Sequence, residues 1–158
     1  MKTLKTDTIM IIDNDTVVIS NERISPNEYI DFLKRSDLGK QYPKENFHKR
    51  IEILLKNVTI SLLAKDKHGK TIGICFGLTD YAYWLNITDL GVDRAYSRKG
   101  IGRKLMQICH ELSGGIDNIT MVAFANHNAV PFYEKIGMVK SKNMMEYSKI
   151  KWTEFVVE

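Results

Sequence analysis

The sequence predicts a single domain of the α/β class. Its length of 158 residues fits one domain, since most domains hold ~100 to 200 residues. Hydrophobic residues make up 44% and charged residues 27%, values typical of globular proteins and unlike those of disordered or fibrous chains. Segments with the two-residue period of strands alternate with segments that have the helical period. We therefore expect residues 1–158 to form one domain around one hydrophobic core.

The N-terminal half is expected to hold two strands followed by two helices. The turn-forming residues Asp13, Asn14 and Asp15 separate two short apolar runs, which would form a hairpin or consecutive edge strands. Ser25 precedes a proline and then a glutamate at the third helical position, a pattern typical of a helix start. The expected elements are strands at 8–13 and 16–20 and helices at 26–36 and 44–56.

The C-terminal half begins with strands and then alternates strand and helix. A turn around Gly69 joins two strands into an antiparallel hairpin. The next strand leads through a glycine-rich turn directly into a helix, and Gly137 ends the last helix. The expected elements are strands at 59–65, 71–79, 85–92 and 119–125 and helices at 102–112 and 129–136, followed by a final apolar stretch at 144–150.

Composition excludes several classes of protein. Cys75 and Cys109 are too few for a disulfide framework or a cysteine zinc site. We expect no signal peptide, because the first apolar run, at 9–12, holds only four residues, and no transmembrane helix, because no run of ~18 apolar residues occurs. The four histidines share no metal-ligand spacing, so no metal is expected. These features predict a cytoplasmic protein without a membrane partner.

The net charge gives a weak preference for anionic partners. The chain carries a formal charge of +4 and has a pI near 9.0, which favours nucleic acid, acidic lipid or a phosphorylated cofactor. A nucleic-acid-binding domain is a poor fit, because the cations gather at one turn and the interleaved aromatic and basic residues of RNA-recognition modules are missing. We therefore expect no nucleic-acid partner.

The turn before the helix at 102–112 combines glycines with cations. A helix N-terminus presents unpaired backbone N–H groups and a partial positive charge to an anion. Gly100 and Gly102 would let the backbone approach a phosphate closely, and Arg98, Lys99 and Arg103 add positive charge. The alternative is that the glycines only shape a loop and the cations form a solvated face. A P-loop and a dinucleotide-binding fingerprint are both excluded, since their further required residues are absent.

Two segments together resemble the GNAT family of acyltransferases. Residues 97–102 resemble its motif A, Gln/Arg-x-x-Gly-x-Gly/Ala, with Ser97 in place of the first residue. Residues 126–138 resemble its motif B, Asn-x-x-Ala-x-x-Phe-Tyr-x-Lys-x-Gly-Phe, with Met138 at the final aromatic position. The order of the motifs and the hairpin before them also agree, so the resemblance covers about residues 59–138.

The resemblance implies a fold and a co-substrate. The family fold is a twisted mixed sheet of six or seven strands with helices on both faces, and two central strands splay apart to form a cleft for acetyl-CoA. The backbone of the strand end at 90–92 would pair with the pantetheine arm as an additional strand would. The implied cofactor-binding residues are Leu90, Gly91 and Val92 for the pantetheine, Arg98, Lys99, Gly100, Ile101, Gly102 and Arg103 for the pyrophosphate, and Asn126, Phe132 and Lys135 for the second half of the cofactor.

Tyr133 is the residue that the resemblance assigns to chemistry. It would protonate the departing CoA thiolate, while the adjacent Phe132 would face another surface; its alternative role is that of a packed core aromatic. Asp89 or Asp80 would accept the proton of the attacking ammonium, although both are equally consistent with turn or edge positions. A backbone N–H near Gly91 would stabilise the oxyanion.

The expected activity is N-acetyl transfer from acetyl-CoA to a primary amine of a small molecule or a protein, by direct transfer. The alternative is a non-catalytic acyl-CoA sensor or interaction module. In the family, acceptor choice resides in the first helices and their loop, here residues 36–42 and Phe47, and in the strand that follows. Tyr81, Tyr83 and Trp84 would either cage an amine or simply pack. Residues 152–157 are consistent with an exposed strand through which two copies would form a homodimer.

Overall fold

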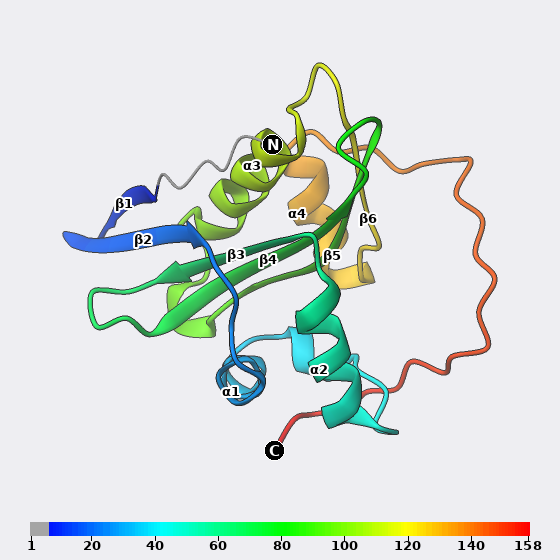
Figure 1. Cartoon of the computed structure of the whole chain (residues 1–158), viewed down its shortest axis with the longest axis horizontal. Helices are drawn as coiled ribbons and strands as arrows, with labels where there is room; N and C mark the ends of the chain where they lie inside the picture. The colour runs from blue at the N-terminus through cyan, green and yellow to red at the C-terminus, as the bar shows by residue number, and fades with distance from the viewer. Residues whose placement is uncertain (1–6) are drawn as a thin grey trace.

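The computed structural model describes residues 7–158, and its centre is one six-stranded sheet (Figure 1). The strands lie in the sheet in the same order as in the chain. They are β1 (Thr8–Ile12), β2 (Asp15–Asn21), β3 (Ile60–Lys65), β4 (Thr71–Thr79), β5 (Trp84–Val92) and β6 (Thr120–Ala123).

The sheet is mixed, as predicted. Each neighbouring pair from β1 to β5 is antiparallel, and β5 and β6 are parallel. The parallel pair needs a crossover, because the chain must return to the same end of the sheet. Helix α3 (Ile101–Ser113) supplies this crossover. The glycine-rich turn therefore lies where β5 ends and α3 begins.

Helices cover both faces of the sheet (Figure 1). Helices α1 (Pro26–Arg35) and α2 (Phe47–Asn57) pack on one face, and α3 and α4 (Val130–Lys135) pack on the other. The buried side chains accordingly form two clusters rather than the one expected core. None of the helices found among residues 7–158 has the length and apolar character needed to cross a bilayer.

The helix boundaries follow local chemistry. The Ser25 hydroxyl accepts from the backbone N–H of Glu28 at 3.2 Å, so Ser25 caps α1 as predicted. Helix α2 begins at Phe47 and not at residue 44, because Asn46 has a left-handed backbone with φ of 56° and residues 44–46 form a turn. Gly137, at φ of 94°, ends α4 as expected.

A β-bulge in β5 changes which face its side chains meet. Phe76 of β4 pairs with Asp89, whereas the next residue, Gly77, pairs with Ile87, so Thr88 is the additional residue. Alternation alone would place the side chain of Asp89 on the face of Ile87, which packs with α3. The bulge instead directs Asp89 to the face of α1 and α2, where Tyr29 contacts it.

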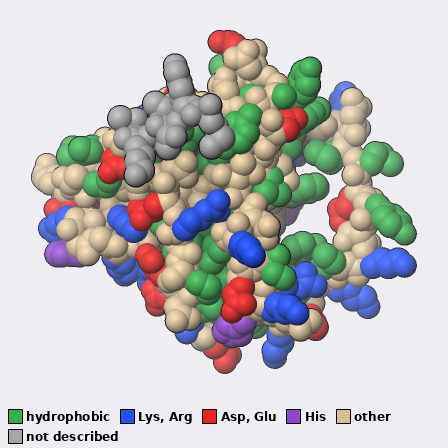
Figure 2. Space-filling model, viewed as in Figure 1, with side chains coloured by type: hydrophobic (Ala, Val, Ile, Leu, Met, Phe, Trp, Pro, Cys, Tyr) green, Lys and Arg blue, Asp and Glu red, His purple; other side chains and the backbone are tan. Residues whose placement is uncertain are grey.

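The chain beyond α4 forms no strand among residues 136–158. Figure 1 shows it leaving α4, passing outside β6 and returning to α1 and α2. Figure 2 shows hydrophobic and charged side chains mixed along the outer part of this segment. We refer to residues 139–152 as the C-terminal loop. Its large exposed hydrophobic side chains are Val139, Met144, Met145, Tyr147, Ile150 and Trp152.

The prediction of an exposed C-terminal strand at 152–157 is wrong. The Phe155 backbone N–H donates to the Lys40 carbonyl at 2.9 Å, forming a single parallel bridge between residues 41 and 155. The Phe155 ring lies edge-on to Phe47, with ring centroids 5.1 Å apart, and Val157 is buried among α1 and α2. The segment thus packs on its own chain, and homodimer formation stays an untested prediction.

Candidate active site

A cleft opens beside the C-terminal end of β5. It encloses about 340 Å³ between β5, the start of α3, the loop before α2 and the segment that contains α4. Seven residues expected to bind the cofactor or act in catalysis line it together: Leu90, Gly91, Val92, Gly102, Asn126, Phe132 and Tyr133.

The two parallel strands separate at this cleft. β6 pairs with β5 only from Trp84 to Ile87, where Ile87 meets Ala123. From residue 89 to residue 92, β5 pairs with β4 alone among the residues that the structure describes. One edge of β5 is therefore open to an extended ligand along the cleft, in agreement with the expected splayed strands.

Gly91 lets the loop after α1 close on the end of β5. A Cβ atom at residue 91 would lie 2.6 Å from Leu38 Cδ1 and 3.2 Å from the Phe32 ring. Leu38 belongs to a short 3-10 helix, Leu38–Lys40, and lines the cleft. The absence of a side chain at Gly91 thus allows Leu38 to form one wall of the cleft.

The glycine-rich turn has the geometry of an anion site. Gly100 is the N-cap of α3 and has φ of 83°, a backbone that glycine adopts without strain. Arg98 also has a positive φ, 63°. Ile101 is buried in the core, which leaves only its backbone N–H to serve a ligand. Arg98 and Arg103 are exposed at the surface of this turn.

Two predicted cations lie less favourably. Lys99 forms an ion pair with Asp13 of the β1–β2 turn, and its Nζ lies 5.7 Å from the centroid of the Tyr96 ring. Lys135 is exposed on α4 and does not line the cleft. Lys99 and Lys135 therefore lie outside the cleft, whereas Gly102 and Phe132 line it.

Tyr133 and Phe132 both line the cleft, so the expectation that they face different surfaces is wrong. Their rings lie at 77° with centroids 5.2 Å apart, and both residues belong to the short helix α4 at the cleft. Burial raises the pKa of Tyr133 to about 12, with smaller contributions from Cys75 and Asp89. Tyr133 therefore stays protonated at physiological pH and is able to donate a hydrogen.

Asp89 is buried against two tyrosines from the other side of the sheet. The Tyr42 hydroxyl donates to Asp89 Oδ1, and the Tyr29 hydroxyl lies 3.1 Å from the same oxygen. Burial raises the pKa of Asp89, and the hydrogen bonds from the two tyrosines oppose that shift. A buried carboxylate with a raised pKa accepts protons more readily than a surface one.

A second cavity of about 530 Å³ adjoins the first. It lies between β5, the loop before α2, residues 124–126 after β6 and the C-terminal loop. Leu38, Gln41 and Asn126 line both cavities, so the two lie side by side. The lining residues that sequence reasoning missed include Asn86, Phe124, Glu146 and Trp152, because no motif contains them.

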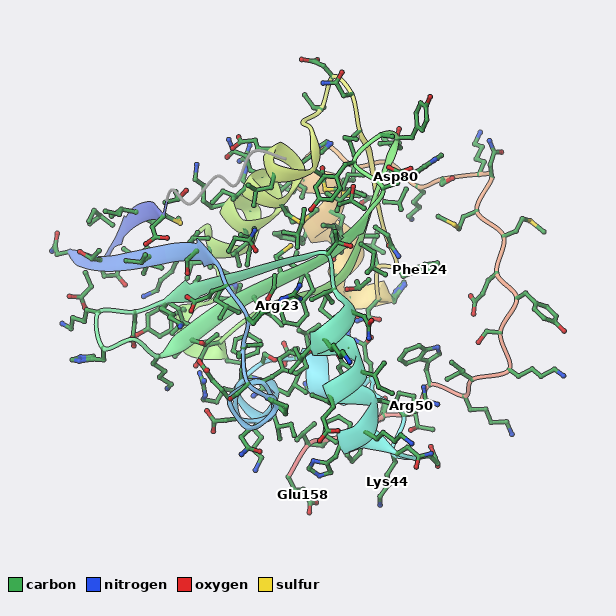
Figure 3. All side chains as sticks on the ribbon, in the orientation of Figure 1. Arg23, Lys44, Arg50, Asp80, Phe124 and Glu158 are labelled. Atoms are coloured by element: carbon green, nitrogen blue, oxygen red, sulfur yellow. The ribbon has the colours of Figure 1, made fainter. Side chains whose placement is uncertain are left out.

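The aromatic cluster proposed for acceptor binding lies elsewhere. Tyr81, Tyr83 and Trp84 are exposed in the β4–β5 hairpin and line neither cavity. Asp80 Oδ1 accepts three backbone N–H bonds of 2.8 to 2.9 Å within this hairpin, which makes Asp80 a turn residue. Figure 3 shows Asp80 at the hairpin and Phe124 at the opposite end of β6.

Phe47 and the histidines also lie apart from the two cavities. Phe47 packs with the C-terminal segment, and His127 is exposed before α4. His110 lies near the end of α3, and its Nε2 is 2.7 Å from the carbonyl oxygen of Ile119. Within residues 7–158, no three His, Cys, Asp or Glu side chains gather in a way that would hold a metal ion.

Solved structures with this fold include acetyltransferases. A GNAT family acetyltransferase of Streptococcus pneumoniae TIGR4 superposes with a TM-score of 0.64 at 18% identity, over 85% of this chain and 99% of that one. The aminoglycoside N-acetyltransferase AAC(6')-Iy, in complex with CoA, superposes with a TM-score of 0.65 at 13% identity, over 89% of this chain and 99% of that one. At these identities the likeness establishes the fold.

The sequence itself gives the family. An uncharacterized N-acetyltransferase of Pyropia yezoensis, ycf52, is 31% identical over 97 residues, which are 58% of this chain and 55% of that protein. The match thus spans little more than half of that relative's length. The family model of the acetyltransferase (GNAT) domain matches residues 21–158, most of the chain. The chain therefore belongs to the GNAT family of acetyltransferases, for which acetyl-CoA is the co-substrate.

Proposed function

We propose that this acetyltransferase moves the acetyl group of acetyl-CoA directly to a primary amine, with Tyr133 as general acid and Asp89 as general base. One observation carries the proposal: the two cavities adjoin each other, and Tyr133 lines the first while Asp89 lines the second. A thioester in the first cavity and an amine in the second would meet between these two side chains. This arrangement suits a transfer without a covalent enzyme intermediate.

Residues of the first cavity support the binding of the acetyl-CoA arm. The open edge of β5 at 90–92 would hold the pantetheine by backbone hydrogen bonds. The α3 N-terminus at Gly100 and the exposed Arg98 and Arg103 would hold the pyrophosphate. Phe132 lies beside Gly102 and would pack against the cofactor as well as the core.

The chemistry is a balanced exchange of bonds at the acetyl carbon. The amine nitrogen bonds to this carbon while the carbon–sulfur bond breaks, and acetyl-CoA supplies the acetyl group in activated form. Asp89 would take a proton from the attacking ammonium, directly or through water. Tyr133 would give its proton to the leaving sulfur and would regain one from the nitrogen, which loses its second proton as the amide forms. A backbone N–H of Gly91 or Val92 would hold the negative charge that develops on the carbonyl oxygen.

The burial of Tyr133 makes its proton harder to transfer, so the position of the leaving sulfur beside it must lower the free energy of that transfer. With a pKa of about 12 against ~8.5 for a free thiol, transfer to a solvated thiolate is uphill by about 3.5 units, or roughly 5 kcal/mol. The same burial would raise the pKa of a thiol held beside it, which reduces the difference. Tyr133 therefore works as a donor only to a sulfur that is itself removed from water.

The proposal includes a cytoplasmic location. The two cysteines are free and fully buried, as small apolar side chains of reduced intracellular proteins are.

An amine panel tests the proposed reaction. Purified protein is mixed with acetyl-CoA and single amines, and both thiol release and the mass of the acetylated amine are followed. We expect saturable release of CoA with at least one amine class, with one acetylated product per thiol. If acetyl-CoA binds in a calorimetric titration and yet no amine raises thiol release above the blank, the chain is an acyl-CoA sensor and the proposal fails.

A further inference from the structure

We infer that the acceptor is an amine with a second positively charged nitrogen, bound in the second cavity, and that Glu146 holds this distal nitrogen. This inference rests on the proposed function, because it names the amine that the same reaction would acetylate. It is carried by the charge, the polar atoms and the walls of the second cavity, which differ from those of the first.

The charged side chains of the second cavity are all acidic. Asp89 lies at its inner wall and Glu146 comes from the C-terminal loop. None of the fourteen lining residues that the structure describes is Lys, Arg or His, although the chain as a whole carries a charge of +4. By contrast, the charged residues that line the first cavity are one acid and one base, Asp37 and Lys40. This difference favours a cationic ligand in the second cavity.

Two carboxylates at different depths suit two positive nitrogens. Asp89 is buried and already accepts hydrogen bonds from Tyr29 and Tyr42, and in the proposed reaction it would face the nitrogen that reacts. Glu146 is exposed on the C-terminal loop and forms no ion pair with the residues at 7–158. A monoamine would leave Glu146 without a counter-charge, whereas a diamine would neutralise both carboxylates.

An unpartnered buried oxygen adds a further acceptor. Asn86 lines the cavity, and its Oδ1 is buried and has no hydrogen-bond partner among the described residues. A buried carbonyl oxygen without a partner costs free energy, so a ligand that donates a hydrogen to it gains that amount on binding. Ammonium groups carry only donors. Asn86 therefore favours the same ligand chemistry as the two carboxylates.

The remaining walls fit the apolar spacer between two nitrogens. Phe124, after β6, and Trp152, at the end of the C-terminal loop, line the cavity together with Tyr42 and Leu54. Aromatic faces attract ammonium groups and also cover methylene groups. A cavity of about 530 Å³ lies within the range that takes small molecules. These walls favour a small diamine over an extended peptide.

Paired amines and paired variants test the inference. Diaminobutane and butylamine share their carbon chain and differ by one nitrogen, and kcat/KM for both is measured in wild type, Glu146→Gln and Glu154→Gln. Glu154 is a matched control, since it is an exposed glutamate near the same end of the chain that lies outside the second cavity. Binding of both amines to protein saturated with CoA is measured by calorimetry, so that one readout does not depend on turnover.

We expect wild type to prefer diaminobutane, and we expect Glu146→Gln to lower the diamine-to-monoamine ratio of kcat/KM at least tenfold. Glu154→Gln should keep the wild-type ratio, and Asn86→Leu should weaken diamine binding at least threefold. If both amines are acetylated with the same ratio in wild type and Glu146→Gln, the inference is overturned and the proposed function stands. Glu146-dependent diamine binding without acetylation would overturn the proposed function and leave the diamine site. If no amine is acetylated and diamine binding does not depend on Glu146, both the inference and the proposed function are overturned.

Discussion

The hydroxyl of Tyr29 lies 3.1 Å from Oδ1 of Asp89, and this contact joins helix α1 to the bulged strand β5. The Tyr42 hydroxyl donates to the same oxygen and lies 2.5 Å from that of Tyr29. A carboxylate with two tyrosine donors at the base of a cavity is oriented before any substrate arrives. Folding keeps this charge buried although burial raises its pKa, which is a cost that an asparagine would avoid.

The cost of the buried Asp89 charge predicts a pH-dependent stability difference. A carboxyl whose pKa is raised in the folded state contributes stability below its unfolded pKa of ~3.9 and loses it as pH rises through the folded pKa. We therefore expect the melting temperature of wild type, relative to Asp89→Asn, to fall as the pH is raised from about 4 to 7. Thermal scans of both proteins across this range measure it. If the melting temperature of wild type instead rises relative to that of Asp89→Asn as the pH increases, folding lowers the pKa of Asp89 and the prediction is wrong.

The left-handed backbone of Gly100 predicts a loss of binding that strain alone does not explain. Gly100 and Gly115 have φ of 83° and 81°, and an added Cβ meets nothing within 4 Å at either position. Alanine should thus cost each about 1 kcal/mol of stability. Only Gly100→Ala should also weaken acetyl-CoA binding, by at least tenfold in calorimetry. Equal affinities in the two variants would mean that the phosphates bind elsewhere.

A bulkier side chain at Gly102 should narrow the cleft with little strain. A Cβ there would lie 3.5 Å from the Phe132 ring and 3.7 Å from Val92 Cγ2, which are ordinary contacts. Gly102→Val extends these contacts into the cleft, and we expect acetyl-CoA affinity to fall about tenfold or more, or ~1.4 kcal/mol. Circular dichroism should show a folded protein. An unchanged dissociation constant in the folded variant would remove Gly102 from the cofactor site.

The ion pairing of the turn predicts unequal effects of its cations. Lys99 already pairs with Asp13, whereas Arg98 and Arg103 are exposed and have no ion pair within residues 7–158. Alanine at Arg98 or Arg103 should raise the acetyl-CoA dissociation constant about three- to tenfold, roughly 1 kcal/mol each, and Lys99→Ala should raise it less. Acetyl-pantetheine, which lacks the pyrophosphate, is the control ligand and should bind all variants alike. Similar losses with both ligands would indicate damage to the cleft itself.

Periodicity and turn chemistry predicted the sheet and its helices because their signals are local. Ser25 capped α1 and Gly137 ended α4 as the residue types predict. The second helix was extended too far because the left-handed conformation of Asn46 leaves no mark in the hydrophobic pattern. The apolar residues at 152–157 looked like a strand, but the contact of Phe155 with Phe47 depends on the tertiary fold.

The sequence likewise predicted only one part of the candidate site. Motifs predicted the first cavity, since residues such as Gly102 and Tyr133 stand at fixed spacings within two segments. The second cavity draws single residues from β5, the loop before α2 and the C-terminal loop, so no spacing connects Asn86 with Glu146. The sequence did not predict the partners of Asp89 either, because the β-bulge at Thr88 determines which face of the sheet its carboxylate meets.

Replacing Tyr133 by phenylalanine tests the account most directly, with Tyr147→Phe, an exposed tyrosine of the C-terminal loop, as the matched control. The ring and its contact with Phe132 remain, and only the proton donor is lost. General-acid assistance is worth ~10²- to 10⁴-fold, so we predict that kcat falls at least tenfold while acetyl-CoA affinity changes less than threefold. Because the pKa of Tyr133 is about 12, the defect should be constant from pH 7 to about 10. It should shrink with acyl donors whose thiols are more acidic. A wild-type kcat in Tyr133→Phe, measured with a confirmed acceptor, would contradict the account.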